Sequence, residues 1–278
     1  MRFGLFGVNF ASCADPEVQR RVVLAAEEVG FESVWTGEHV ALPIRDNPVP
    51  TPAETPFLDS LVALARIAGF TSRVRLGTGI LVLPHHNPVL IAKALASLDV
   101  VSGGRVIAGF AGGYAEPEFR ALGVAFRQRG AITDESLRAI RTLWTDEVPS
   151  FRGRFADFAD IRFEPKPVQR PHPPIIVGGM APAALRRAAR EGDGWYGFAL
   201  TVEQTAPVVA ELRRLRTELG RGDAPFEISL TTFEPVTPEL VAAADRAGIH
   251  RLIVFPPVPA DALEAFVRDL GGRFCRAA

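Results

Sequence analysis

The chain has 278 residues, of which 47% are hydrophobic and 23% are charged, and its formal net charge is −1. This composition is typical of a globular protein with a large core, and α/β barrels of this length usually form one domain. No basic run favours nucleic acid, no stretch resembles a membrane span or signal peptide, and Cys13 and Cys275 suggest neither a disulfide framework nor a zinc site. We therefore expect one cytoplasmic domain over residues 1–278 that holds no metal and binds neither nucleic acid nor membranes.

Short apolar runs alternate along the chain with segments of helical periodicity. The expected strands are residues 2–10, 33–36, 74–83, 105–110, 175–178, 194–198, 226–233 and 251–255. The expected helices are residues 16–29, 58–68, 88–101, 135–144, 182–191, 202–219, 238–247 and 261–270. Irregular insertions interrupt this alternation at about residues 40–57 and 111–172, and the second contains a short hairpin near residues 151–155.

Alternation of this kind predicts parallel strands joined by right-handed crossovers, and eight such units predict an α/β fold of the (β/α)8 TIM-barrel type with insertion segments. The alternative is an open doubly wound sheet. That fold usually has fewer units and a Gly-rich fingerprint after its first strand, where this chain has Asn-Phe-Ala-Ser-Cys at residues 9–13. In a barrel the carboxyl ends of all strands meet on one face, which we call the mouth, and chemistry is usually placed there. The expected mouth residues are Val8, Asn9, Glu38, His39, Gly79, Ile80, 111–118, Gly178, Gly179, Phe198, Phe233, Pro256 and Pro257.

An acid and an imidazole stand side by side at the end of the second expected strand, before a long Pro-rich loop. His39 is the leading candidate for proton transfer, because imidazole titrates near neutral pH. Glu38 could orient His39, although adjacent residues of a strand point to opposite sides. The alternative is that His39 only hydrogen-bonds the backbone of the loop.

Small residues follow the fourth and fifth expected strands, at residues 111–113 and at Gly178-Gly179. Such residues let backbone N–H groups approach a phosphate or a planar ring, and the helix that begins near Pro182 points its N-terminus at the second pair. Simple turns are the alternative, since neither pair forms a known nucleotide-binding motif. For His85-His86 we expect a role in the loop rather than a metal site, because adjacent histidines diverge and no other His or Cys is spaced to join them.

Six segments occur in an order that resembles the luciferase-like monooxygenase family, and within it the branch of probable F420-dependent oxidoreductases. The segments are GFESVWTGEH (30–39), LGTGILVLP (76–84), LDVVSGGR (98–105), GVAF (123–126), PPIIVGG (173–179) and GDGW (192–195). Each is weakly specific alone, and together they extend to about residue 200. The last two strands match only loosely.

This resemblance implies a barrel with insertions, usually a homodimer, that holds the deazaflavin coenzyme F420 or reduced FMN with the reactive edge of its ring over the mouth. The implied activity is hydride transfer between F420 and a small organic substrate. The alternatives are an FMNH2-dependent monooxygenase that uses O2, with a partner reductase supplying reduced cofactor, and a flavin-binding barrel without turnover. The implied catalytic residues are His39 and Glu38, and the implied cofactor contacts are Val8, Gly79, Ile80, Ala111, Gly112, Gly113, Gly178 and Gly179. Relatives place a non-prolyl cis peptide where Gly79-Ile80 falls.

Two departures from the sugar-phosphate dehydrogenases of this family limit the substrate. Those relatives carry Glu after the glycines of the fourth strand, where this chain has Tyr114 followed by Glu116 and Glu118, and Glu118 could be a helix N-terminal acid. They also grip the phosphate with lysines after later strands, and no lysine follows Lys166. Glucose 6-phosphate is therefore not expected, and an apolar or mixed small molecule is. The acidic tail of F420 would need arginines, for which the candidates are Arg45, Arg105 and Arg152.

Overall fold

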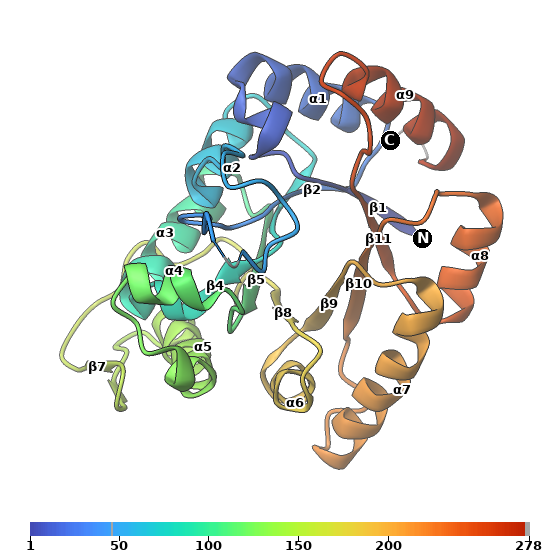
Figure 1. The fold of residues 1–278 in the computed structure, drawn as a ribbon. Helices are drawn as coiled ribbons and strands as arrows, with labels where there is room; N and C mark the ends of the chain where they lie inside the picture. Colours follow the sequence, from blue (N-terminus) through green and yellow to red (C-terminus); the bar gives the residue numbers. More distant parts are fainter. Residues whose placement is uncertain (46, 276–278) are drawn as a thin grey trace.

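The computed structural model describes residues 1–45 and 47–275, and it shows a closed parallel barrel surrounded by helices (Figure 1). The barrel strands are β1 (Arg2–Phe6), β2 (Ser33–Thr36), β3 (Arg75–Thr78), β4 (Leu81–Val82), β5 (Val106–Ala111), β8 (Ile175–Gly178), β9 (Gly194–Phe198), β10 (Glu227–Thr232) and β11 (Arg251–Val254). Their order is β3-β2-β1-β11-β10-β9-β8-β5-β4, and a further pairing of β3 with β5 closes the ring. The predicted (β/α)8 barrel is therefore confirmed.

Helices connect successive strands and cover the outside of the barrel (Figure 1). They are α1 (Pro16–Glu28), α2 (Ser60–Ala68), α3 (Pro88–Val101), α4 (Glu116–Ala121), α5 (Arg129–Thr145), α6 (Pro182–Glu191), α7 (Val202–Glu218), α8 (Pro238–Arg246) and α9 (Leu263–Phe274). Local chemistry sets their starts: the Asp15 carboxylate caps α1, the Asn87 amide caps α3, and Thr201 forms a capping box with Gln204 on α7. None of the helices within the described ranges has the length and apolar character needed to cross a membrane.

The structure differs from the sequence prediction near the mouth. β1 ends at Phe6 instead of Phe10, because Gly7 turns the chain with a φ of +88°. The third predicted strand is divided into β3 and β4 at the Gly79–Ile80 peptide, which is cis. Helix α4 was not predicted, because its six residues include Pro117 and are too few for a periodic apolar pattern.

The second insertion also holds more helix than its sequence indicates. α5 begins at Arg129 rather than near Glu135, and the early part of this helix contains Gly130 and polar residues that favour helix weakly. The predicted hairpin is present as β6 (Phe151–Arg152) and β7 (Asp157–Phe158). The Glu135 carboxylate holds its turn by accepting backbone N–H groups from residues 154–156.

Large side chains fill the interior of the barrel. Trp35 and Tyr196 lie in parallel with ring centroids 5.8 Å apart, and Phe6 packs in the same cluster. Gly4 and Gly77 make room for the indole, since an added Cβ at either position would lie within 3 Å of it. Trp195 is fully buried in the layer between barrel and helices.

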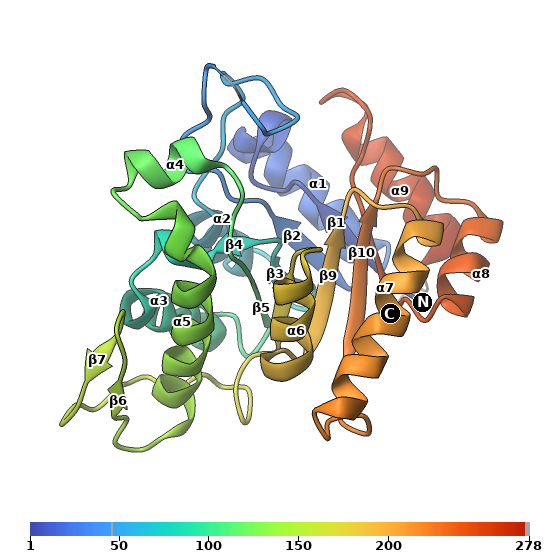
Figure 2. The same ribbon diagram turned by 60° about the horizontal axis from the view of Figure 1, so that its bottom comes forward.

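The amino end of the barrel, which we call the floor, is filled by a cluster of charged side chains. Arg251 is fully buried, and its guanidinium bonds both Glu32 oxygens at 2.9 and 3.0 Å and also reaches Glu227. The guanidinium carbon also lies 5.4 Å from the centroid of Trp35. At the opposite end, α4 and the loop between β2 and α2 stand together above the strands (Figure 2). The mouth is therefore the end left for a site.

Candidate active site at the barrel mouth

His39 lies just beyond β2 and is held by a carboxylate from the second insertion. Its Nδ1 lies 3.0 Å from Glu118 Oε2, and the other oxygen of Glu118 accepts the N–H groups of Val40 at 2.9 Å and Ala41 at 3.3 Å. The Glu118 side chain is 2% exposed and that of His39 is 14% exposed. Glu118 thus fixes both the imidazole and the start of the loop.

The charge of Glu118 determines which nitrogen of His39 is available. Burial alone would raise the pKa of Glu118, but the hydrogen bond and charge of His39 together with the two backbone N–H groups outweigh burial and lower the pKa. The ionised carboxylate can only accept a hydrogen bond, so Nδ1 of His39 carries a proton. Nε2 has no hydrogen-bond partner among the described residues, which leaves it able to accept or donate a proton.

Glu38 points away from His39, as neighbouring residues of an extended segment do. One Glu38 oxygen lies 2.8 Å from His86 Nε2, and the other accepts the Val82 N–H at 2.5 Å. Burial would lower the pKa of His86, but its pairing with Glu38 outweighs burial and raises it. The expected pairing of Glu38 with His39 is therefore not formed, because Glu118 holds His39 and Glu38 fastens β4 and its following turn.

The two adjacent histidines diverge, as the sequence predicted. The ring of His85 packs edge-on against Phe119 with centroids 4.5 Å apart, and its nitrogens are buried with no partner in the described part of the chain. This burial lowers the pKa of His85. Across residues 1–45 and 47–275, no three His, Cys, Asp or Glu side chains are grouped as metal ligands would be.

Several predicted cofactor contacts do lie together beside these groups. An added Cβ at Gly178 would lie 2.7 Å from the Ile80 side chain and 3.9 Å from Ala111 Cβ, so these residues form one continuous surface. Gly113, at a φ of +75°, leaves room for Val82 and Phe119, since an added Cβ would lie within 3 Å of both. Gly112 lies between Ala111 and Gly113 in the sequence and is half-buried. A Cβ added to Gly112 would contact the Thr133 side chain.

The other predicted contacts differ in position. Gly79 lies deeper, where an added Cβ would lie 3.2 Å from Trp35. Gly179 is exposed, with a φ of +114°, just before the N-terminus of α6, which no side chain caps. Val8 is fully buried in the layer between barrel and helices, so its side chain does not reach the mouth.

Two of the three candidate arginines lie away from the mouth. Arg105 precedes β5 at the floor end, where it bonds the Ala68, Thr71 and Val74 carbonyl groups. Arg152 lies in the β6–β7 hairpin, away from the mouth loops (Figure 2). Arg45 is exposed in the loop between β2 and α2.

Sequence reasoning placed Tyr114 and Glu118 among the expected mouth residues but did not pair them with His39, and it did not expect Phe57 there. Phe57 stands edge-on to the imidazole at 5.3 Å and Tyr114 at 6.2 Å, and they come from different insertions. Tyr196 lies buried below, with its hydroxyl 2.8 Å from Thr231 Oγ1, and burial raises its pKa. The only sequence signal for the Glu118 contact was an unexplained pair of acids, Glu116 and Glu118, after the glycines of the fourth strand.

The fold and the mouth together define a (β/α)8-barrel protein whose site combines an imidazole–carboxylate pair with a surface of small residues. The sequence profile of the luciferase-like monooxygenases matches residues 1–269, and the chain belongs to this family.

Relatives within the family differ in cofactor. An uncharacterised Mycobacterium tuberculosis protein is 34% identical over 244 residues, covering 84% of this chain and 83% of its own. The F420-dependent glucose-6-phosphate dehydrogenase of Amycolatopsis mediterranei is 34% identical over 195 residues, 67% of this chain and 56% of its own. The FMNH(2)-dependent dimethylsulfone monooxygenase of Pseudomonas putida is 34% identical over 174 residues, 59% of this chain and 48% of its own.

Solved structures agree on the fold. Monooxygenase RslO1 from Streptomyces bottropensis superposes with a TM-score of 0.79 at 23% identity, covering 99% of this chain and 98% of its own. An F420-dependent secondary alcohol dehydrogenase superposes with the same TM-score of 0.79 at 17% identity, covering 98% and 99%.

Proposed function

We propose that this protein binds F420 at the barrel mouth and transfers a hydride between the cofactor and a small organic substrate. The observation that carries this proposal is the His39–Glu118 pair, which leaves His39 Nε2 without a partner in the described chain, at the same end of the barrel as Ile80, Ala111 and Gly178. A redox site of this kind needs a proton carrier beside a planar cofactor, and residues of the mouth would supply the first and bind the second.

The shape of the mouth fits a flavin-like ring with a phosphate-bearing chain. The surface of Ile80, Ala111 and Gly178 is apolar, and the Ile80 side chain packs directly over Gly178, so a flat ring would lie against this side chain. The exposed Gly179 and the uncapped N-terminus of α6 would receive a phosphate, because backbone N–H groups at a helix start attract anions.

When bound, F420 supplies a two-electron hydride acceptor or donor. For an alcohol substrate, His39 Nε2 would accept the hydroxyl proton as the hydride leaves the carbon, and it would return that proton when a ketone is reduced. Glu118 would hold the imidazole in one orientation and stabilise its protonated form, as a buried carboxylate can. Glu38 would act indirectly by fixing the turn that follows β4.

A second candidate is an FMNH2-dependent monooxygenase that uses O2, which is favoured by the Pseudomonas putida relative at 34% identity. The preference for F420 rests on the branch that the sequence motifs resemble. A flavin-binding barrel without turnover is the third possibility, and the preorganised His39–Glu118 pair argues against it.

A fluorescence titration with F420 and separately with FMN tests the proposal. Tight binding of F420, followed by loss of its oxidised absorbance with a substrate, is the expected result. A preference for FMN would favour the FMNH2-dependent monooxygenase. Failure of both cofactors to bind would overturn the proposal. Gly178→Val should abolish binding in either case, because its side chain would enter the Ile80 surface.

Further expectations concern assembly and location. We propose a homodimer that uses the outer faces of α2 and α3, where Val62, Leu90 and Val101 are exposed. We also propose a cytoplasmic enzyme that takes its reduced cofactor from a reductase. Light scattering of the purified protein distinguishes the dimer from the monomer.

A further inference from the structure

Phenylalanine rings form a continuous wall along one side of the mouth. We call this the aromatic wall, and its members are Phe6, Phe10, Phe57, Phe198, Phe233 and Phe255. The wall begins beside His39, because Phe57 stands edge-on to the imidazole and stacks on Phe10 at 4.6 Å. It continues from Phe10 to Phe255 at 5.9 Å. Each ring contacts the next at a distance typical of aromatic pairs.

The far end of the wall is exposed to solvent. Phe198 at the end of β9 is 42% exposed, and Phe233 just after β10 is 58% exposed, although their rings contact each other edge-on at 5.7 Å. Large apolar side chains gathered at a surface mark a place where another apolar molecule binds. The other end of the wall meets the proton carrier through Phe57, so a molecule that lies along the wall would be the substrate of that site.

Glu234 follows Phe233 directly in the chain, and its carboxylate is already engaged. The Glu234 carboxylate accepts the Val202 N–H at 2.9 Å and the Thr232 hydroxyl at 3.2 Å, which fixes the start of α7. Its negative charge would repel an anionic substrate, and the phenylalanine rings of the wall carry no charge that could pair with one. A phosphate or carboxylate would therefore lose its hydration there without gaining a partner.

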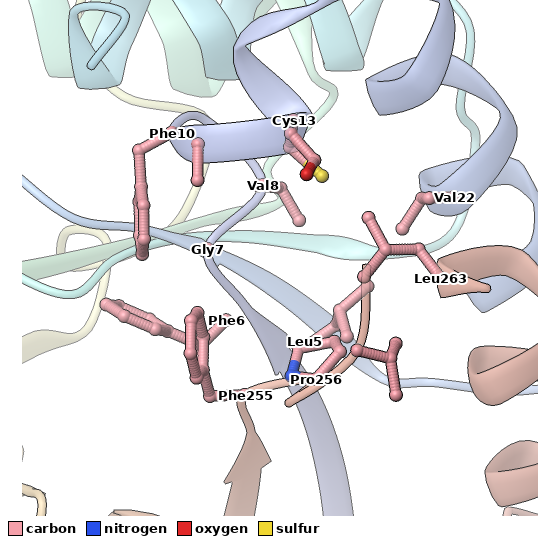
Figure 3. A pocket seen from close by; sticks show the side chains of 13 residues that line it. Leu5, Phe6, Gly7, Val8, Phe10, Cys13, Val22, Phe255, Pro256 and Leu263 are labelled. Carbon is pink, nitrogen blue, oxygen red and sulfur yellow. The ribbon is translucent and has the colours of Figure 1, made fainter. Parts of the chain in front are cut away.

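A small apolar cavity lies behind the wall. Its volume is about 70 Å³, and Figure 3 shows Phe6, Phe10 and Phe255 on one side of Gly7, with Val8, Val22 and Leu263 on the other. Gly7 permits this arrangement, because an added Cβ would lie 3.1 Å from Phe255 and 3.3 Å from Phe10. The cavity offers space for an alkyl substituent of a few carbons, provided that the rings part.

We infer that the aromatic wall selects an uncharged, ring-bearing alcohol or ketone whose ring lies against Phe198 and Phe233 while its oxygen reaches His39. This inference rests on the proposed function and specifies its substrate class. It distinguishes the chain from its glucose-6-phosphate dehydrogenase relative, whose substrate is an anionic sugar.

Ligand-detected NMR with acetophenone as the probe tests the wall without requiring turnover or cofactor. Acetophenone should bind the full-length protein, and glucose 6-phosphate should not compete with it. Phe198→Ala and Phe233→Ala should each weaken acetophenone binding about five- to tenfold. Phe151→Ala is the matched control, because Phe151 stacks on Phe158 in the distant hairpin and should leave binding unchanged.

The variant Phe233→Arg provides a second test. It should abolish acetophenone binding and let a sulfonated or phosphorylated aromatic compound bind instead, with circular dichroism confirming the fold. Absence of acetophenone binding, or binding that all three alanine variants leave equal, would overturn the inference. Failure of F420 and FMN to bind, with the acetophenone results intact, would overturn only the proposed function.

Discussion

The polar groups at the two ends of the barrel differ in how completely they are paired. At the floor, Arg251 is fully buried and its charge is satisfied by Glu32 and Glu227. At the mouth, Glu118 is equally well satisfied, but it holds an imidazole whose second nitrogen is left without a partner in the described chain. Burial and pairing close one end, whereas incomplete pairing leaves the other end chemically available.

Aromatic side chains show the same contrast. Trp35 fills the lower barrel with no exposed surface, and glycines make room for its ring. Phe198 and Phe233 near the mouth remain exposed. Packing alone explains the first group. The second group would be covered by the substrate that we infer, so perturbing each end should give a different phenotype.

The largest effect is expected from His39→Gln. Removing a general acid–base group lowers turnover by roughly 10²- to 10⁴-fold. The affinity for F420 should change little, because Ile80, Ala111 and Gly178 are untouched. Stopped-flow absorbance of the bound cofactor measures turnover, and unchanged turnover would show that His39 carries no proton.

Arg251→Met tests the floor. Removing one partner of a buried ion cluster costs about 3–5 kcal/mol of unfolding free energy, because Glu32 loses its partner and Glu227 keeps only Arg2. Urea unfolding measures this loss. Arg268→Met is the matched control, because Arg268 is exposed and pairs with Glu28 and Glu264, and exposed pairs of this kind contribute little to stability. Equal losses in the two variants would refute the structural role of the floor cluster.

Glu118→Gln should give a smaller effect on turnover, about tenfold, since the amide keeps a hydrogen bond to His39 but loses the charge. It should also change stability in acid. The pKa of Glu118 is lowered on folding from about 4.3 in an unfolded chain, so its stabilisation is complete above that pH and is lost as the pH falls through the folded pKa. As the pH is lowered from 6 to 3, the urea midpoint of unfolding should therefore fall more steeply for the wild type than for Glu118→Gln. An identical pH dependence in the two proteins would contradict this account.

The smallest effect concerns Glu38 and His86. The pKa of His86 is raised above about 6.5, so its stabilisation is complete below that pH and is lost as the pH rises through the folded pKa. Carbon-13 NMR of labelled histidines should show His86 titrating above its ordinary range, and Glu38→Gln should bring it down. A titration that does not respond to this substitution would show that Glu38 is not its partner.

The barrel was predictable because it is specified locally. Each strand and its helix are defined by short apolar runs and by caps such as Asp15 and Asn87, and repetition of this unit leaves few topologies. The positions of His39, Ala111 and Gly178 at the mouth followed from the same rule, since each falls at or just after the end of a predicted strand. Ile80 fell inside the predicted strand 74–83, and it lies at the mouth because β3 ends at Thr78.

The partners across the mouth were not predictable. Glu118 and His39 are 79 residues apart, and Glu118 lies on a six-residue helix within an insertion that has no repeating pattern. Glu38 is adjacent to His39 in sequence, yet the extended backbone turns it toward His86. The aromatic wall was not predictable either, because single phenylalanines at separate strand ends become neighbours only when the barrel closes.

A crystal structure of the protein with bound F420 tests the central claim most directly. The account predicts the ring against Ile80, Ala111 and Gly178, with His39 Nε2 facing the space between the ring and Phe198. A ring bound elsewhere, or a His39 turned away from that space and still paired with Glu118, would contradict it.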